Sequence, residues 1–188
     1  MNIPNYLSLF RILLVAVFVS SLLYYTPAES YFHRLSIGIF LLACLTDALD
    51  GWVARRFNQK TVLGSYLDPI ADKVLLMSGF LSLTFMHHLP PQTRLPVWVT
   101  VPVITRDLLI VMGAILVYLI TGGLKSEPLV ISKITTFCQM ATLFLALIQV
   151  PHLIITLFCL ATVALTVLSG VGYFQMGNRM LQQSGKAL

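Results

Sequence analysis

The acidic residues of this 188-residue chain are clustered, because four of the seven fall within 26 positions, at Asp47, Asp50, Asp68 and Asp72. On a helix with about 100° per residue, Asp47 and Asp50 share one face. Asp68 and Asp72 are four positions apart and share a face of the next predicted helix. Two antiparallel helices joined by a loop through Lys60 can turn these faces toward each other. We therefore expect the four carboxylates to converge.

Convergent carboxylates of this kind indicate a site for divalent cations. Four such groups repel one another unless positive charge compensates them, and Arg55 supplies only one charge. Hard oxygen ligands suit Mg²⁺ or Mn²⁺, and two ions ~3.5–4 Å apart can bind a diphosphate during displacement at phosphorus. Gly51 and Ala54 lack bulk, so a large ligand can approach the backbone there. Gly64 would relieve crowding in the turn.

A structural role is the alternative for these carboxylates, which could cap helices and pair with Arg55, Arg56 and Lys73. Pro69 disfavours helical geometry at Asp68, so we expect the second helix either to begin at Asp68 or to bend there. Both geometries keep Asp68 close to Asp72.

The composition indicates which elements position the cluster. Hydrophobic residues make up 57% of the chain, charged residues only 10% and the mean hydropathy is +0.88, whereas typical soluble domains are ~25% charged. This excludes a soluble globule, a disordered chain and a nucleic-acid-binding domain. We predict an all-α polytopic membrane protein, with residues 1–188 as a single domain. The six predicted spans are 7–25, 34–56, 66–87, 96–120, 129–149 and 152–176, with Pro96, Pro128 and Pro151 marking helix starts.

The distribution of Lys and Arg predicts the orientation of the chain in the membrane. With a cytoplasmic N-terminus, the outside loops carry only Arg34 and Arg94. The inside segments then carry Arg55, Arg56, Lys60, Lys125, Arg179 and Lys186. This predicts an integral protein of a bacterial inner (cytoplasmic) membrane, in contact with its lipids, whose active site faces the cytoplasm.

The N-terminal residues form a polar stripe, because Asn5, Ser8 and Arg11 recur every three positions. One interpretation is an interfacial helix segment at the cytoplasmic surface. The other is that this stripe forms a wall of the carboxylate site.

The acidic cluster belongs to a longer pattern with defined spacing. It reads Asp47-x-x-Asp50-Gly51-x-x-Ala54-Arg55, eight residues, Gly64, three residues, Asp68, three residues, Asp72. This pattern resembles the complete signature of the CDP-alcohol phosphatidyltransferase family, and the length and predicted spans are also similar to that family.

The resemblance implies the transfer of a phosphatidyl group from CDP-diacylglycerol to an alcohol, with release of CMP. It also implies a homodimer, metal binding by the four aspartates, and Asp72 as the general base. The N-terminal segment Pro4-Asn5-x-Leu7-Ser8-x-x-Arg11 is similar to the entry segment of the family. The positions that the resemblance assigns to CDP-diacylglycerol are Asn5, Asp50, Gly51, Ala54, Arg55 and Gly64.

The acceptor alcohol is predicted from basic residues in the second half of the chain. Arg106 lies deep in an apolar run, and Lys125 and Lys133 flank the start of the fifth span. Arg106 could pair with Asp107 or with a site carboxylate, and Lys125 could contact headgroups. As a pocket for a phosphate, however, the three residues favour glycerol 3-phosphate as the acceptor and phosphatidylglycerophosphate as the product.

Other acceptors and other functions remain open. Two short segments resemble those of cardiolipin synthases more than those of phosphatidylglycerophosphate synthases. They are Thr105-Arg106-Asp107 and Ser132-Lys133, and the cardiolipin synthases in question use CDP-diacylglycerol and phosphatidylglycerol. Phosphatidylinositol-phosphate or phosphatidylserine synthesis comes third. A small ion or proton transporter with intramembrane aspartates is an alternative of another class, although the carboxylates gather at one side and no inverted repeat is present. A prenyl-diphosphate enzyme shares the metal chemistry but does not explain Gly51, Ala54 and Arg55.

Overall fold

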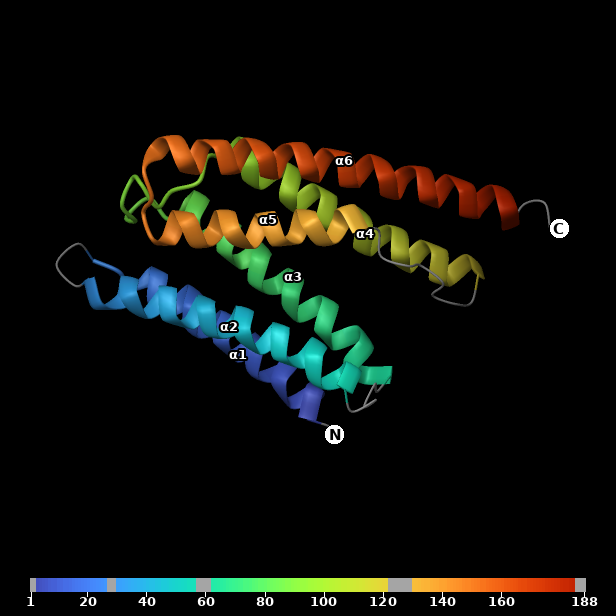
Figure 1. Ribbon diagram of the computed structural model, residues 1–188, viewed down its shortest axis with the longest axis horizontal. Helices are drawn as coiled ribbons and strands as arrows, with labels where there is room; N and C mark the ends of the chain where they lie inside the picture. The colour runs from blue at the N-terminus through green and yellow to red at the C-terminus, as the bar shows by residue number, and fades with distance from the viewer. Residues whose placement is uncertain (1–2, 27–29, 57–61, 122–129, 185–188) are drawn as a thin grey trace. The chain divides into compact units, whose positions relative to one another are not determined.

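A computed structural model describes the backbone of residues 3–26, 30–56, 62–121 and 130–184, and side chains mainly over 9–26, 31–47, 71–113 and 130–176. Within these ranges the chain forms six helices and no strand (Figure 1). The all-α prediction is therefore confirmed. The helices are α1 (Ile3–Leu23), α2 (Ser30–Arg56), α3 (Val62–Phe85), α4 (Val97–Thr121), α5 (Val130–Leu147) and α6 (His152–Ser184).

Local sequence explains several of the helix ends. α4 begins directly after Pro96, whose carbonyl accepts a hydrogen bond from the Val99 N–H at 3.0 Å. α6 begins directly after Pro151, as predicted, because a proline at a helix start gives up an N–H that would have no intrahelical partner. α5 ends where Gln149 takes a left-handed conformation with φ of 56°, which turns the chain before Pro151. Pro128 lies outside the described residues.

Two helices differ from the expected starts. α1 runs without a break from Ile3 to Leu23, and no proline or glycine follows Pro4 within it, so the N-terminal segment is the first part of this helix. Its position at the membrane interface stays a prediction. The second helix of the acidic pattern begins at Val62, so Asp68 is not its N-cap and Gly64 lies inside α3 rather than in the turn. Pro69 removes one intrahelical hydrogen bond, a loss of ~3 kcal/mol that the rest of the 24-residue helix offsets.

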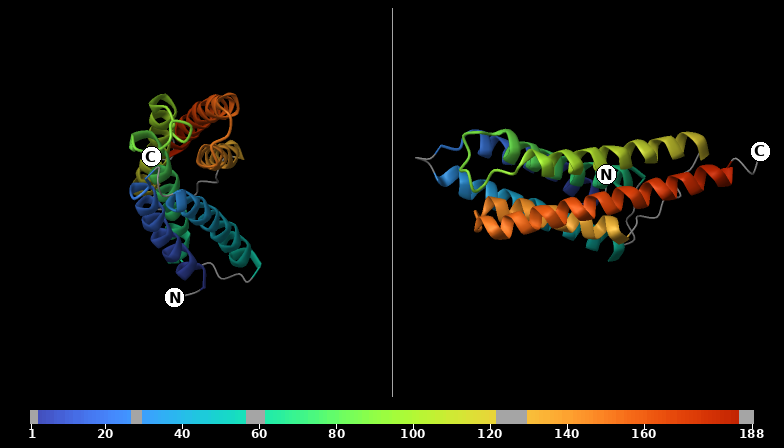
Figure 2. Two further views of the ribbon diagram at one scale, coloured as in Figure 1. Left: turned by 90° about the vertical axis from the view of Figure 1, so that its left-hand side faces the viewer. Right: turned by 90° about the horizontal axis from the view of Figure 1, so that it is seen from above.

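The chain divides into two compact units. The first comprises Met1–Leu95 and Leu143–Pro151. In it α1 packs against both α2 and α3, and α1 and α2 run in opposite directions (Figures 1 and 2). The Phe18 and Phe40 rings pack with their centroids 5.9 Å apart, and both side chains are buried. The single-domain assignment for residues 1–188 stays a prediction.

The second unit comprises Pro96–Thr142 and His152–Leu188. In it α4 packs against α6, and α5 runs antiparallel to α6 (Figure 1). Hydrogen bonds join α5 to α6, including one of 2.7 Å between the Thr142 and Thr162 hydroxyls and one of 3.2 Å from the Thr135 hydroxyl to the Leu165 carbonyl. Such interhelical polar contacts are typical of helices that associate in lipid.

Two helices in the described part of the chain are long and apolar enough to cross a membrane, over Val130–Leu147 and His152–Met176. Only 39% and 28% of these windows is buried inside the protein, so much of their apolar surface faces outward. Phe137, Leu153 and Phe174 are each more than 70% exposed. These features favour membrane association over a soluble core. A total of six spans stays a prediction.

Candidate functional site

The backbone places the whole acidic pattern on two consecutive helices. Asp47, Asp50 and the residues through Arg55 lie near the C-terminal end of α2, and Gly64, Asp68 and Asp72 lie in the first half of α3. Asp47 and Asp72 are the two aspartates of the pattern whose side chains are described. The side chains of the other predicted donor-site residues lie outside the described set: Asn5, Asp50, Gly51, Ala54, Arg55, Gly64 and Asp68.

Arg11 of α1 joins the two described carboxylates. Its Nη1 lies 2.9 Å from Asp47 Oδ1 and also forms an ion pair and hydrogen bond with Asp72 Oδ1. The Arg11 side chain is fully buried, whereas those of Asp47 and Asp72 are 32% and 29% exposed. One guanidinium therefore ties three helices together, and the carboxylates remain accessible from outside.

The packing of α1 against α2 explains why Arg11 meets Asp47. Arg11, Leu14 and Phe18 follow each other at three- and four-residue intervals and share one buried face of α1. Phe40 and Asp47 lie two turns apart on the inner face of α2. Because the two helices are antiparallel and Phe18 packs against Phe40, the residue seven positions before Phe18 meets the residue seven positions after Phe40. The apolar core thus sets the register that places Arg11 against Asp47.

The donor set of this cluster fits a divalent cation. Asp47 and Asp72 come from neighbouring helices, yet their Oδ1 atoms already contact one cationic nitrogen. Carboxylate oxygens are the ligands that Mg²⁺ and Mn²⁺ prefer. Among the described residues no group of three His, Cys, Asp or Glu side chains gathers at a metal-binding distance. The fit therefore rests on this pair, with Asp50 and Asp68 as the further predicted ligands.

A second polar cluster surrounds Arg106 of α4, whose side chain is only 4% exposed. The Arg106 Nη1 donates to Asp107 Oδ1 at 2.7 Å, and its Nη2 donates to the hydroxyls of Ser132 and Ser169 at 2.6 Å each. The guanidinium also lies 5.7 Å from the centre of the Tyr173 ring, a cation–π contact. This cluster joins α4, α5 and α6, because Asp107 lies on α4, Ser132 on α5, and Ser169 and Tyr173 on α6.

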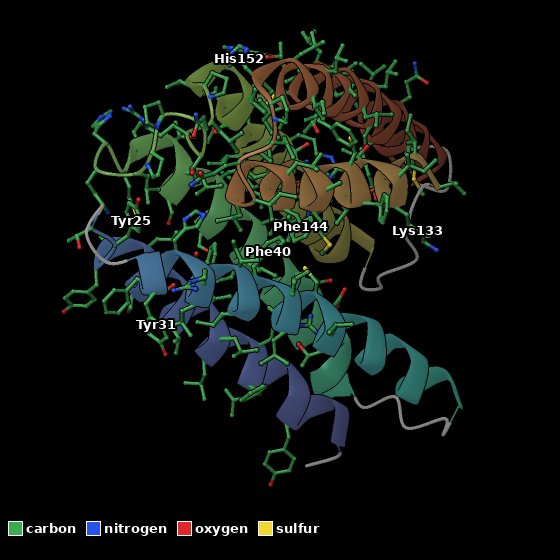
Figure 3. All side chains as sticks on the ribbon, turned by 60° about the vertical axis from the view of Figure 1, so that its left-hand side comes forward. Tyr25, Tyr31, Phe40, Lys133, Phe144 and His152 are labelled. Atoms are coloured by element: carbon green, nitrogen blue, oxygen red, sulfur yellow. The ribbon has the colours of Figure 1, made fainter. Side chains whose placement is uncertain are left out.

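The predicted acceptor residues lie in different environments. Arg106 is buried and paired with Asp107, the pairing that the sequence left open, and its Nε has no hydrogen-bond partner among the described residues. Lys133 is exposed in the first turn of α5, next to Ser132 (Figure 3). Lys125 lies outside the described residues.

The partners that hold these two arginines were not predicted from the sequence. Arg11 was not paired with Asp47 and Asp72, although the polar stripe that contains Arg11 pointed toward the carboxylate site. Ser169 and Tyr173 lie 63 and 67 positions from Arg106. No short-range pattern identifies those two residues.

Comparison with known proteins gives consistent matches. Residues 1–168 match the family model described as CDP-alcohol phosphatidyltransferase. The chain is 33% identical over 188 residues to the CDP-diacylglycerol--glycerol-3-phosphate 3-phosphatidyltransferase of Wigglesworthia glossinidia brevipalpis, covering 96% of this chain and 97% of the relative. It is 36% identical over 181 residues to the enzyme of that name from Salmonella typhimurium, with 92% of each chain covered. A probable phosphatidylglycerophosphate synthase of Mycobacterium tuberculosis is 33% identical over 175 residues, covering 92% of this chain and 79% of the relative.

Proposed function

The chain belongs to the CDP-alcohol phosphatidyltransferase family, and on this basis we propose that it transfers a phosphatidyl group from CDP-diacylglycerol to glycerol 3-phosphate. The products are phosphatidylglycerophosphate and CMP. The observation that carries the reaction class is the convergence of Asp47 and Asp72, from α2 and α3, on one cation. The names of relatives that match nearly the whole chain support glycerol 3-phosphate as the acceptor.

The donor site is assigned to the acidic pattern and to the N-terminal helix. Asp47, Asp50, Asp68 and Asp72 would hold Mg²⁺ or Mn²⁺, in our proposal two ions. When bound, such ions neutralise the diphosphate and stabilise the charge that develops on the departing CMP. Arg55 adds positive charge beside the diphosphate. The remaining assigned contacts to CDP-diacylglycerol are Asn5, Gly51, Ala54 and Gly64.

Asp72 is assigned as the general base. One of its carboxylate oxygens accepts the proton of the acceptor hydroxyl while that hydroxyl attacks the β-phosphorus, and the bond from this phosphorus to the CMP oxygen breaks. The partial exposure of the Asp72 side chain supports this role, because the acceptor must reach it. In the metal-free protein, Arg11 contacts this carboxylate from the buried side. General-base assistance of this kind contributes ~10²–10⁴-fold to the rate.

The acceptor phosphate is assigned to Arg106, Lys125 and Lys133. A guanidinium presents a rigid set of donors that matches phosphate oxygens. The buried cluster around Arg106 fixes the orientation of this side chain, and its Nε makes no hydrogen bond within the described residues, which leaves a donor for an anion.

The membrane topology is part of the same proposal. We assign six spans, a cytoplasmic N-terminus and an active site that faces the cytoplasm in a bacterial inner membrane. The distribution of Lys and Arg between alternate loops supports this orientation. We also assign a homodimer, which rests on family membership alone.

The test is an acceptor panel with the purified full-length protein. CDP-diacylglycerol and Mg²⁺ or Mn²⁺ are supplied with glycerol 3-phosphate, phosphatidylglycerol, inositol phosphate or serine, each in a separate reaction. Mass spectrometry identifies the lipid product, and CMP release gives the rate.

We expect phosphatidylglycerophosphate from glycerol 3-phosphate, and no product after the metal is chelated. Cardiolipin formed from phosphatidylglycerol, with no reaction of glycerol 3-phosphate, would overturn the acceptor assignment in favour of the alternative suggested by Ser132-Lys133. Proton flux without any CMP release would overturn the reaction class in favour of a transporter. Glu29→Gln, which changes an acidic residue outside the pattern, is the matched control for variants of the four aspartates.

A further inference from the structure

We propose that Arg11 and the divalent cation compete for the carboxylates of Asp47 and Asp72, so that Arg11 occupies the metal-free site and is displaced when metal binds. This inference rests on the proposed function, because it takes these two aspartates as metal ligands. It adds a role for Arg11, which would act as a built-in counter-ion that sets the metal concentration at which the site fills.

The geometry makes the two cations mutually exclusive. A single nitrogen, Arg11 Nη1, contacts Oδ1 of both aspartates, and these aspartates come from different helices. A divalent ion held by both aspartates would bind their carboxylate oxygens at ~2.0–2.6 Å, depending on the metal, and would therefore lie close to the guanidinium that contacts the same two groups. A guanidinium and a metal ion that shared this position would repel each other at short range. Binding of one therefore requires the withdrawal of the other.

Burial explains why the metal-free protein needs Arg11. Without a cation, Asp47 and Asp72 would present two negative charges to the same point beside the core formed by Leu14 and Phe18. Arg11 reaches this point from the interior and is fully covered, so it compensates the charge without closing the outer side. The carboxylates remain about 30% exposed, which leaves a path for an incoming ion.

The charges indicate the direction of the exchange. A guanidinium carries one positive charge and Mg²⁺ or Mn²⁺ carries two, so the metal displaces Arg11 once its concentration is sufficient. The apparent affinity for the metal equals the intrinsic affinity multiplied by the fraction of molecules that are competent to bind it. If the state with Arg11 withdrawn is populated at ~1–10%, the presence of Arg11 weakens the apparent metal affinity by ~10–100-fold.

The direct test measures Mn²⁺ binding to the full-length protein in lipid nanodiscs, without substrate, from the electron paramagnetic resonance signal of free Mn²⁺. Four proteins are compared: wild type, Arg11→Met, Arg11→Lys and the control Arg34→Met, which changes an exposed arginine on α2. Arg11→Met should bind Mn²⁺ ~10–100-fold more tightly than wild type, by the same population argument. Arg11→Lys should lie between them, and the control should match wild type. Unchanged or weaker binding by Arg11→Met overturns the proposal.

A second measurement uses the wild type alone, in case the Arg11 variants do not fold. Phenylglyoxal modifies accessible arginines, and mass spectrometry quantifies its reaction at Arg11 relative to Arg94 in the same molecule. Saturating Mn²⁺ should increase the labelling of Arg11 and leave that of Arg94 unchanged. Labelling of Arg11 that stays constant or falls on Mn²⁺ addition overturns the exchange.

These outcomes are distinguishable from failure of the proposed function. If wild type makes phosphatidylglycerophosphate in a metal-dependent reaction but Arg11→Met binds Mn²⁺ no more tightly, only the competition is wrong. If wild type makes no phosphatidylglycerophosphate yet shows the exchange, the metal site stands and the proposed reaction fails. If wild type binds no Mn²⁺, the metal assignment and the competition fail together.

Discussion

The buried ion pair between Arg106 and Asp107 leads to the sharpest stability prediction. Their charged atoms lie 2.7 Å apart, and the two side chains are only 4% and 1% exposed. Asp107→Leu removes the negative charge and leaves the arginine buried among apolar helices. Breaking a buried pair in this way costs ~3–5 kcal/mol, because an uncompensated charge remains. Arg106 would keep its hydrogen bonds to Ser132 and Ser169, so we expect a loss of about 3 kcal/mol, at the lower end of this range.

Removing both charges should cost less than removing one. In the double variant Arg106→Met with Asp107→Leu, no charge remains to be buried, and replacing a buried pair with apolar residues is often neutral. The two serine hydroxyls lose their arginine partner, but a hydroxyl on a helix can bond a carbonyl of its own preceding turn. We therefore expect the double variant to lie within about 1 kcal/mol of wild type, allowing for the usual worth of a lost hydrogen bond.

The assay is reversible unfolding of the full-length protein in mixed micelles, followed by circular dichroism as denaturing detergent is added. Wild type, both single variants, the double variant and Arg34→Met are compared at one lipid composition. Addition of Arg106→Met to Asp107→Leu should restore most of the lost stability. The reasoning is refuted if Asp107→Leu is as stable as wild type, or if the double variant is less stable than Asp107→Leu alone.

Three further predictions concern turnover and packing. Asp72→Asn should lower the rate of CMP release by ~10²–10⁴-fold while CDP-diacylglycerol still binds, and a rate near that of wild type would remove Asp72 from the general-base role. Thr142→Val removes a 2.7 Å hydrogen bond to α6 and should destabilise the protein by ~0.6–1.7 kcal/mol in the same unfolding assay, more than Thr156→Val, whose hydroxyl bonds within its own helix. Equal losses would contradict an interhelical role for that bond. Gly79→Ala places a methyl group 2.9 Å from a methyl of Leu143 and should lower the stability by ~1–3 kcal/mol in the same assay. In Gly113→Ala the added methyl group meets no atom within 4 Å, so this variant should be as stable as wild type or more stable. A larger loss for Gly113→Ala than for Gly79→Ala would refute the close packing at Gly79.

Local features of the sequence predicted much of the fold. The apolar runs placed Asp47 on α2 and Asp72 on α3, and residues three, four or seven positions apart share a helix face whatever the rest of the chain does. Proline acts on its own residue and its neighbour, and Pro96 and Pro151 correctly marked helix starts. At Pro69 the same rule left two outcomes open, and a helix start at Asp68 is excluded because α3 begins at Val62.

Only the tertiary structure decided which polar groups from distant parts of the chain meet. Arg11 lies 61 positions from Asp72, and Ser169 lies 63 positions from Arg106, so no helical period connects them. In the first unit, the contact between Phe18 and Phe40 sets the register that brings Arg11 to the carboxylates. In the second, the packing of α4 against α6 brings Arg106 to its hydroxyl partners. Side-chain spacing within a helix is set by the backbone, and the sequence therefore determined where each acidic face lies. The cation that each face meets depends on how separate helices pack, and that depends on apolar contacts between residues far apart in the chain.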